Sequence, residues 1–345
     1  MSTQLGAIMR SEIEEIPQVF ERVKASASHI SAAIAQLPLK DVDSVILVAR
    51  GTSDNAALYL KYLIETKIGI PCGLASPSVV SIYGATLVYK NVLVIALSQS
   101  GQSPDLVGYC TAARAGGATV VAMTNDPQSP LAQSAQCHLD LQAGPEEAVA
   151  ATKSYSAQLL LSRLFVASWS GELFNCDGVI AQARSLLAQS NQVKAIAENF
   201  TYDQGVTTMG RGFAYANAHE AALKIQETLK IPVASFSSAD YLHGPISSLH
   251  SQSRLILFAP SSMAHNAMAA TVLRIREITS HIFWIGTGFT LASDEILIGG
   301  SVGLPETDAV ITDSIILQLF ALFLSISAGK NPDAPIGLVK VTKTT

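Results

Sequence analysis

Short runs of Val, Ile and Leu alternate with longer amphipathic stretches over most of the chain. The runs VILVA (45–49), VLVIAL (92–97) and TVVAMT (119–124) are separated by stretches with helical periodicity, one from about Asn55 and one from about Pro104. Such alternation is typical of parallel strands joined by crossover helices. Because the runs are apolar at consecutive positions, both faces of each strand should be buried under helices. The pattern predicts an α/β fold built on parallel sheets.

The same pattern occurs twice. ETKIGIP begins at Glu65 and ETLKIP at Glu227, which is 227 − 65 = 162 positions later, and the apolar runs from Leu93 and from Leu255 have the same separation. Two independent pairs of segments that share the same separation indicate duplication of an α/β unit. The first unit should close with a long helix over residues 150–170. The expected organisation is an N-terminal helical region (1–40), a first domain (41–185), a second domain (200–330) and a tail (331–345).

The charge pattern argues against nucleic acid as a partner. The chain has 22 Lys and Arg against 27 Asp and Glu, a formal net charge of −5, and its basic residues are scattered along the sequence. Only 14% of residues are charged whereas 49% are hydrophobic. So little polar surface predicts a large subunit interface in addition to the cores, and therefore a homo-oligomer.

We expect a cytoplasmic protein. The N-terminal stretch lacks the apolar core of a signal peptide. The most apolar segment, residues 314–329, is shorter than a bilayer span of about 20 residues and contains Gln318, so we interpret it as a core or interface helix. Four irregularly spaced cysteines without a C-x-x-C pair are expected to be reduced, structural thiols.

Hydroxyl and amide side chains gather where two of the apolar runs end. LSQSGQSPD (97–105) follows one run and ARGTSDN (49–55) includes the end of another. A loop from a parallel strand into a helix presents backbone N–H groups and a positive dipole end, which together bind anions. N-capping alone would explain one such loop equally well, but two on successive strands favour a phosphate group. The expected side-chain donors are Thr52, Ser53, Ser98, Gln99, Ser100 and Ser103, with Gly101 allowing close approach of the backbone.

The chemistry of these loops favours a sugar phosphate over a nucleotide. Hydroxyls and amides with few cations suit a phosphate ester without magnesium, and neither G-x-x-x-x-G-K-[ST] nor G-x-G-x-x-G occurs in the chain. No grouping of Cys and His has metal-ligand spacing, so neither a metal nor a cofactor is expected. In the second copy the equivalent position holds PSSM (260–263), which predicts one composite site per chain.

A series of longer motifs extends through nearly the whole chain. It comprises EIEEIP, GTSDNA, LSQSGQSPD, AATKSY, MGRGFAYANAHEAALKIQE, LHGP and DAPIGLVKVTKT. In this series the chain resembles sugar isomerase (SIS) domain proteins, and more closely the isomerase half of glucosamine-6-phosphate synthase. The resemblance implies two tandem SIS domains, each a flavodoxin-like five-stranded parallel sheet with helices on both faces. It also implies phosphate binding by the serine-rich loops, and a homodimer in which each site borrows a residue from the partner chain.

The resemblance implies three catalytic residues. Glu227, in KIQETLKIP, matches the synthase carboxylate that moves a proton between C2 and C1 of the sugar. His243, in YLHGP, is the candidate for ring opening and would reach into the neighbouring subunit's site. Lys340, in the tail GLVKVTKT, matches a lysine that forms a Schiff base with the ketose, and here it could either do so or polarise the same carbon. Taken without the resemblance, a solvated helix acid, a structural histidine and a tail lysine are the alternatives.

Further residues are expected at the sugar. Glu220 and Lys224 share a helix face with Glu227, and Lys224 could hold Glu227 ionised, contact a sugar hydroxyl or simply pair with Glu220. Glu146, in GPEEAVAATK, matches a synthase carboxylate near the sugar, and Ala150 is expected to line the same site. The neighbouring residue, Ala151, stands where the synthase pattern has Ser, which removes one contact.

The expected activity is that of an amino-sugar phosphate deaminase. The sequence begins almost at the isomerase part of the synthase, without its glutaminase domain, and so resembles glucosamine-6-phosphate deaminases and related deglycases. Such an enzyme converts glucosamine 6-phosphate and water to fructose 6-phosphate and ammonia. A fructosamine-phosphate deglycase, a galactosamine-6-phosphate deaminase or a plain aldose–ketose isomerase would need the same residues. A sugar-phosphate-binding regulator is the non-enzymatic alternative, but it would have no use for Glu227, His243 and Lys340 together.

Overall fold

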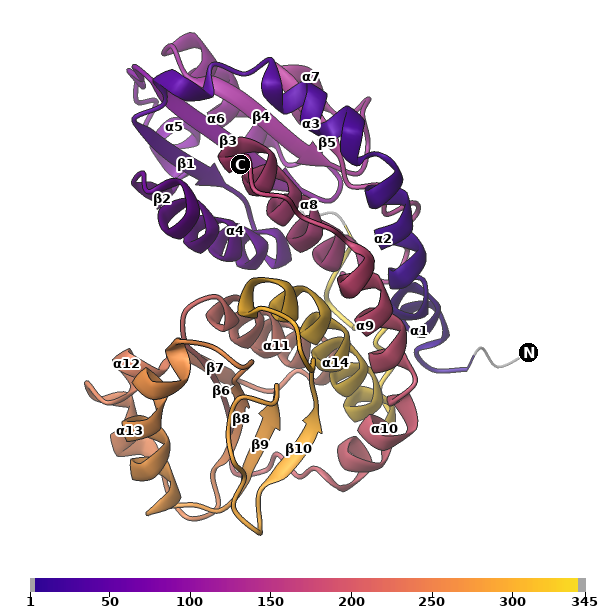
Figure 1. The fold of residues 1–345 in the computed structure, drawn as a ribbon. Helices are drawn as coiled ribbons and strands as arrows, with labels where there is room; N and C mark the ends of the chain where they lie inside the picture. Colours follow the sequence, from indigo (N-terminus) through magenta and orange to yellow (C-terminus); the bar gives the residue numbers. More distant parts are fainter. Residues whose placement is uncertain (1–3, 341–345) are drawn as a thin grey trace. The chain divides into compact units, whose positions relative to one another are not determined.

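The computed structural model describes residues 4–340 (Figure 1). By their packing these residues fall into two units, which we name after their sheets. The β1–β5 unit contains residues 18–146, 153–176 and 339–340, and the β6–β10 unit contains residues 4–17, 147–152 and 177–338. Each unit is therefore assembled from separate segments of the chain. The expected domain limits of 41–185 and 200–330 stay predictions.

The β1–β5 unit is a five-stranded, wholly parallel sheet with helices on both faces (Figure 1). Its strand order is β2-β1-β3-β4-β5. The apolar run of the central strand is buried because helices cover it from both sides. The strands are β1 (Ser44–Val48), β2 (Cys72–Leu74), β3 (Val92–Ser98), β4 (Thr119–Thr124) and β5 (Cys137–Asp140). The helices on one face are α3 (Ala27–Ala35), α4 (Thr52–Leu63) and α8 (Lys153–Ser170), and on the other α5 (Ser78–Ser81), α6 (Pro104–Ala115) and α7 (Pro130–Ser134).

The β6–β10 unit repeats this architecture. Its sheet is also parallel and five-stranded, in the order β10-β9-β8-β6-β7. The strands are β6 (Val206–Gly210), β7 (Val233–Ser237), β8 (Arg254–Phe258), β9 (Ile282–Ile285) and β10 (Ile296–Gly299). The helices are α1 (Ala7–Glu14), α9 (Asp177–Leu187), α10 (Ser190–Asn199), α11 (Ala214–Leu229), α12 (Ser238–Tyr241), α13 (Ala264–Arg276) and α14 (Glu306–Ser327); α2 (Ile16–Ala25) begins here and ends in the other unit. The predicted fold class, two parallel α/β sheets, is confirmed.

The offset seen in the sequence is also the offset between the two sheets. β6 begins 206 − 44 = 162 residues after β1, and β8 follows β3 by the same interval. The pairing register agrees as well, since Val45 lies opposite Leu93 and Thr207 lies opposite Leu255. Read from β7, the second strand order is that of the first. Equivalent loops can therefore be compared by subtracting 162 from the residue number.

Helix α14 contains the most apolar segment of the chain. Among the described residues it is the one helix long and apolar enough to cross a membrane, but 94% of its apolar window is buried within the protein. It packs against α9, α10 and α11. The amide of Gln318 donates a hydrogen bond to the carbonyl of Thr152 (3.0 Å), so its polar group is satisfied inside the core. The sequence predicted a core or interface helix, and the structure shows a core helix.

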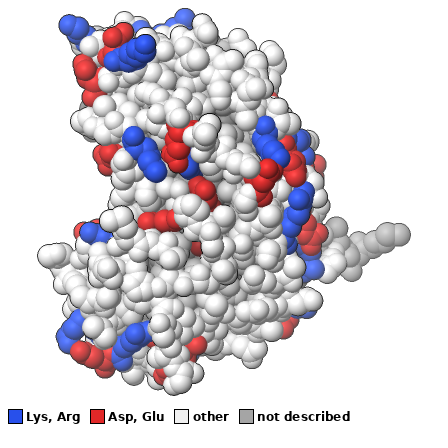
Figure 2. All heavy atoms as spheres, in the orientation of Figure 1, with Lys and Arg blue, Asp and Glu red and all other residues white. Residues whose placement is uncertain are grey.

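Charged side chains of both signs are interspersed on the face of the molecule that Figure 2 shows. Figure 2 shows Lys and Arg beside Asp and Glu on the face in view, and no basic stripe there. The exposed pairs Lys61–Glu65 and Lys194–Glu198 are of this kind. A mixed surface gives no continuous field for a phosphate backbone.

Three of the four cysteines, Cys72, Cys110 and Cys176, are buried. Burial raises the pKa of the Cys72 and Cys110 thiols to about 12, so neither forms a thiolate near neutral pH. Buried thiols of this kind pack as small apolar side chains.

Candidate functional site

The predicted phosphate loops lie at the point where the strand order of the first sheet reverses. In sheets with this topology, ligands bind beyond the carboxyl ends of the strands, at the switch between the first and third strands. Here the switch lies between β1 and β3. Thr52 and Ser53 open α4 just after β1, whereas Ser98 ends β3 and residues 99–103 lead into α6. The topology therefore brings the two loops to one edge of the sheet.

The loop after β3 leaves its hydroxyl protons available. The Oγ of Ser98 accepts a hydrogen bond from the N–H of Gly101 (3.0 Å), and the Oγ of Ser100 accepts one from the N–H of Gln102 (3.3 Å). Ser103 occupies the N-cap position of α6, but its side chain makes no capping bond. A serine that accepts with a lone pair can still donate its proton. The hydroxyl protons of these serines are therefore not used in helix capping and can be donated to an anion.

Gly101 is required where it stands. Its φ is +62°, and a Cβ there would lie 2.3 Å from the Oγ of Ser129. Ser129 caps α7 by accepting a hydrogen bond from the N–H of Ala132 (3.3 Å). The loop therefore passes so close to Ser129 that a side chain larger than hydrogen does not fit at position 101.

The loop after β1 is held by two residues that the sequence analysis did not single out. The amide of Gln158, on α8, donates to the Oγ of the buried Ser53 (2.9 Å), which leaves the Ser53 proton available. Arg50 donates through Nε and Nη2 to Oδ2 of Asp105 (2.9 and 2.8 Å), in the first turn of α6. This ion pair ties the two loops together. The sequence could have indicated Arg50, because it directly precedes the GTS motif. No feature of the sequence around Gln158 indicates that this residue contacts the site.

Lys340 and Glu146, both expected at the sugar, meet in the β1–β5 unit. The Glu146 carboxylate is buried and accepts hydrogen bonds from the N–H and Oγ of Ser154 (3.0 and 2.7 Å). The Nζ of Lys340 donates to the same carboxylate (2.9 Å) and keeps 23% of its side chain exposed. The end of the described chain is therefore anchored by a buried acid. Ser154 is a further residue here that the sequence analysis missed.

One face of α11 carries the predicted base. Glu220 and Lys224 are fully buried, whereas the side chain of Glu227 is 23% exposed. The Nζ of Lys224 is hydrogen-bonded to Glu227 and lies 3.5 Å from Oε1 of Glu220. A buried ammonium needs compensating charge, and the two carboxylates supply it. Lys224 thus pairs with both acids, and Glu227 is the one whose carboxylate reaches the surface.

The other two predicted residues of the β6–β10 unit differ in exposure. His243 lies in the turn after α12, where its N–H donates to the carbonyl of Asp240 (3.0 Å). Its side chain is exposed and has no hydrogen bond to any of residues 4–340, unlike a structural histidine in a core. Ala150 is fully buried, and its only polar groups are those of the backbone. With Glu220, Lys224 and Glu227, these residues belong to the β6–β10 unit, and the remaining predicted residues belong to the other.

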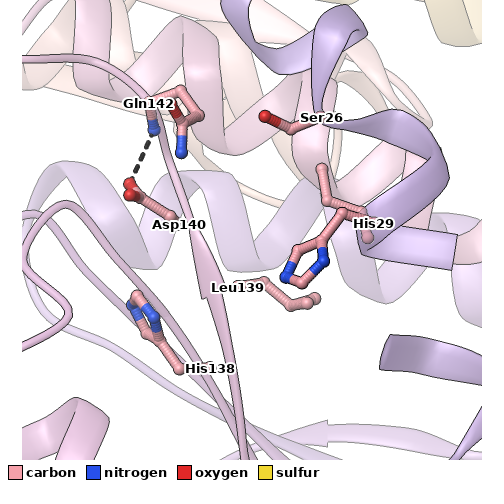
Figure 3. A pocket seen from close by; sticks show the side chains of 7 residues that line it. Ser26, His29, His138, Leu139, Asp140 and Gln142 are labelled. Carbon is pink, nitrogen blue, oxygen red and sulfur yellow. Dashed lines mark hydrogen bonds between the residues drawn. The ribbon is translucent and has the colours of Figure 1, made fainter. Parts of the chain in front are cut away.

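A separate cavity of about 200 Å³ lies beside β5 and contains none of the predicted residues. It is formed by the start of α3 and by β5 with the loop that follows (Figure 3). Burial lowers the pKa of His138, whose Nε2 is 2.9 Å from the Oγ1 of Thr124. Within residues 4–340, no group of three His, Cys, Asp or Glu is arranged to hold a metal ion. The lining residues are Ser26, His29, Ile30, His138, Leu139, Asp140 and Gln142.

Comparison with known proteins shows that the chain belongs to the SIS domain family. The SIS domain profile matches residues 38–168. The isomerizing glutamine–fructose-6-phosphate aminotransferase of Methanothermobacter thermautotrophicus is 30% identical over 341 residues, which cover 96% of this chain and 56% of that protein. The chain spans about half the length of the curated relatives it matches.

Two solved structures match nearly the whole chain. A protein from Silicibacter pomeroyi, assigned as a phosphosugar isomerase, is 31% identical with a TM-score of 0.74, covering 94% of this chain and 99% of that one. The C-terminal domain of the glucosamine-fructose-6-phosphate aminotransferase of Francisella tularensis superimposes with a TM-score of 0.85 at 20% identity, covering 95% and 98%. At that identity the second match establishes the fold alone.

Proposed function

Because the chain belongs to the SIS domain family, we propose that it is a phosphosugar isomerase-type enzyme, and specifically a glucosamine-6-phosphate deaminase. The observation that carries the proposal is the pair of hydroxyl-rich loops at the β1/β3 switch point. Their serines accept hydrogen bonds from within the protein and retain protons to donate. Phosphate would be bound by Thr52, Ser53, Ser98, Gln99, Ser100 and Ser103.

The proposed reaction has three stages. His243 transfers a proton between the O1 hydroxyl and the ring oxygen, which opens the ring. Glu227 then takes the proton from C2 and returns it to C1, while the nitrogen on C2 gives up one proton and O1 gains one. The amine-bearing carbon thereby becomes an imine and C1 becomes a CH₂OH group. Water adds to the C2 imine and ammonia leaves, giving fructose 6-phosphate. The ammonium of Lys224 donates a hydrogen bond to Glu227 and so positions the carboxylate of the proposed base.

Lys340 is proposed to act as a cation near C2. The Nζ of Lys340 is held in an ion pair with the buried Glu146 carboxylate, 2.9 Å away. An ammonium polarises a carbon–nitrogen double bond but cannot attack it, because its lone pair carries a proton. The contact therefore supports polarisation over Schiff-base formation. Glu220 and Ala150 are proposed to complete the sugar site.

We further propose that the enzyme is a cytoplasmic homodimer with shared active sites. The exposed turn carrying His243 supports this assembly, because an exposed imidazole is accessible to a neighbouring subunit. The low fraction of charged residues, 14%, is also suited to a large interface.

An ammonia-release assay tests the proposed function. Purified protein is given glucosamine 6-phosphate, galactosamine 6-phosphate, fructosamine 6-phosphate and unphosphorylated glucosamine. We expect ammonia from the first and none from glucosamine. Glu227→Gln should bind the sugar phosphate but release no ammonia, since the amide cannot accept the C2 proton. Ammonia release by this variant at the wild-type rate would remove Glu227 from the mechanism.

A further inference from the structure

Two motifs of the sequence begin with an acid that the proposed reaction does not use. Glu12 is the first residue of EIEEIP and lies in α1, and Asp333 is the first residue of DAPIGLVKVTKT. Both belong to the β6–β10 unit. The side chain of Glu12 is only 5% exposed. Because burying a carboxylate is costly unless hydrogen bonds replace its hydration, the contacts of Glu12 should be specific.

The Glu12 carboxylate holds the backbone of residues 147–152, the part of the β6–β10 unit that connects β5 to α8. Its Oε1 accepts hydrogen bonds from the N–H groups of Glu147 and of Ala148 (3.3 Å for the second). This segment contains neither helix nor strand, so its backbone lacks the regular partners that those elements supply. A side chain more than 130 residues away in the sequence pairs its N–H groups instead.

The same segment is held at two further points. The N–H of Val149 donates to the carbonyl of Asp333 (3.0 Å). The carbonyl of Thr152 accepts from the amide of Gln318 on α14 (3.0 Å). The path of the backbone is therefore fixed on both sides of Ala150, which is proposed to line the sugar site.

Helix α1 is itself fixed by the start of the tail. Oδ1 of Asp333 accepts from the N–H of Met9 (2.8 Å), and Oδ2 accepts from the N–H of Ile8 (3.2 Å). These N–H groups lie in the first turn of α1, where an α-helix has no internal partner for them. The capped helix places Glu12 against the segment, so the two motifs and residues 147–152 form one connected hydrogen-bond network.

We infer that Glu12 is a positioning residue, whose carboxylate sets the path of residues 147–152 and thereby the place of Ala150 at the sugar. The inference rests on the proposed function, in which Ala150 completes the sugar site. Glu12 acts through backbone N–H groups of the segment, so its effect should fall on how the sugar is oriented. The serine loops proposed to bind the phosphate belong to the other unit and do not depend on it.

Two substitutions of Glu12 test the inference. Both N–H groups donate to one oxygen, so the amide oxygen of Glu12→Gln can still accept them, whereas Glu12→Met has a similar length and only a weak acceptor. For ammonia release from glucosamine 6-phosphate, kcat should fall about 10- to 100-fold in Glu12→Met and stay within about 3-fold of the wild type in Glu12→Gln. The dissociation constant of inorganic phosphate should be unchanged in both. Glu14→Met, at an exposed position of the same helix, is the control and should keep the wild-type kcat.

The phosphate measurement separates positioning from a general structural role. If Glu12→Met lowers kcat only in proportion to the fraction of protein that still binds phosphate, the inference is overturned. A wild-type kcat in Glu12→Met would overturn it as well. If Glu12→Met does not fold, Glu12→Asp keeps the charge but withdraws the oxygen by one methylene, and it should lower kcat at unchanged phosphate affinity. An unchanged kcat in that variant would count against the inference.

Hydrogen exchange keeps the inference separate from the proposed function. If the wild type releases no ammonia, the proposed deaminase activity is refuted, and exchange then decides whether Glu12 sets the path of the segment. Measured by mass spectrometry, peptides containing residues 147–149 should exchange about 10-fold faster in Glu12→Met than in the wild type and in Glu12→Gln, because a hydrogen bond to a carboxylate is lost. Equal exchange in the three proteins would overturn the inference.

Discussion

Four acidic residues show how strongly packing decides what a carboxylate can do. Glu220 is fully buried beside Lys224, Glu227 shares that ammonium but reaches the surface, and Glu146 is buried against Lys340. Glu306, the first residue of α14, has a buried Oε1 without a hydrogen-bond partner among residues 4–340. Helical spacing in the sequence is enough to predict that Glu220, Lys224 and Glu227 share one face. Their exposure could not be predicted, because it depends on helices that are distant in sequence. The burial of Oε1 of Glu306 could not be predicted for the same reason.

The pH dependence of stability should report on Glu306. Burial raises its pKa to about 7, against the hydrogen bonds from Ser262 and Phe213 that lower it, and the ordinary value is 4.5. Between these pH values the folded state binds more protons than the unfolded state. The free energy of unfolding should therefore fall as the pH rises from about 4.5 to 7.

Urea denaturation across this range should show a smaller fall for Glu306→Gln than for the wild type. Asp313, whose pKa burial raises to about 6, is present in both proteins and contributes equally. Parallel profiles would contradict the assignment.

The elements that the sequence predicts best are the long and strongly periodic ones. The three apolar runs became β1, β3 and β4, and the long helix expected over 150–170 is α8, from Lys153. Short elements such as α5 and β10 carry too few residues to show a period, so tertiary contacts decide them. The phosphate loops were recognised because Ser and Gly follow apolar runs. The ion pair of Arg50 with Asp105 was not, because its partners lie on different crossovers.

The loop after β3 should be sensitive to a single added methyl group. In Gly101→Ala the residue must keep φ near +62° and its Cβ would meet Ser129, so we expect a loss of about 1–3 kcal/mol in unfolding free energy and a raised KM for the sugar phosphate. Gly108→Ala, within α6, is the matched control. Apart from its chain neighbours and the backbone of α6 itself, no atom of residues 4–340 lies within 4 Å of its added Cβ, and the helix should gain up to about 1 kcal/mol. Equal stability and KM in the two variants would show that the loop geometry is not constrained.

At the scale of the whole molecule, duplication was visible in the sequence because paired motifs kept one offset. It correctly anticipated two sheets of one topology. It did not show that each unit is assembled from several segments, since chain crossings between units leave no composition signal. The prediction of one composite site per chain stays a prediction.

Mixing two inactive variants tests the shared site. If His243 serves the partner subunit, a dimer of one Glu227→Gln chain and one His243→Ala chain has one site with both lesions and one intact site. Ammonia release should then return on mixing after subunit exchange, up to about a quarter of the wild-type rate for statistical pairing. Each variant incubated alone is the control. No recovery in demonstrated mixed dimers would assign His243 to its own subunit's site.

The central claim, that hydroxyls at the β1/β3 switch point hold the phosphate ester, is tested most directly by calorimetric titration. Glucosamine 6-phosphate is titrated into Glu227→Gln, which cannot turn it over, and into the same variant carrying Ser100→Ala. We predict a dissociation constant weaker by about 10-fold in the double variant, the loss expected for one hydrogen bond to a charged group, and no difference for unphosphorylated glucosamine. Identical dissociation constants for the phosphate ester in the two proteins would contradict the account.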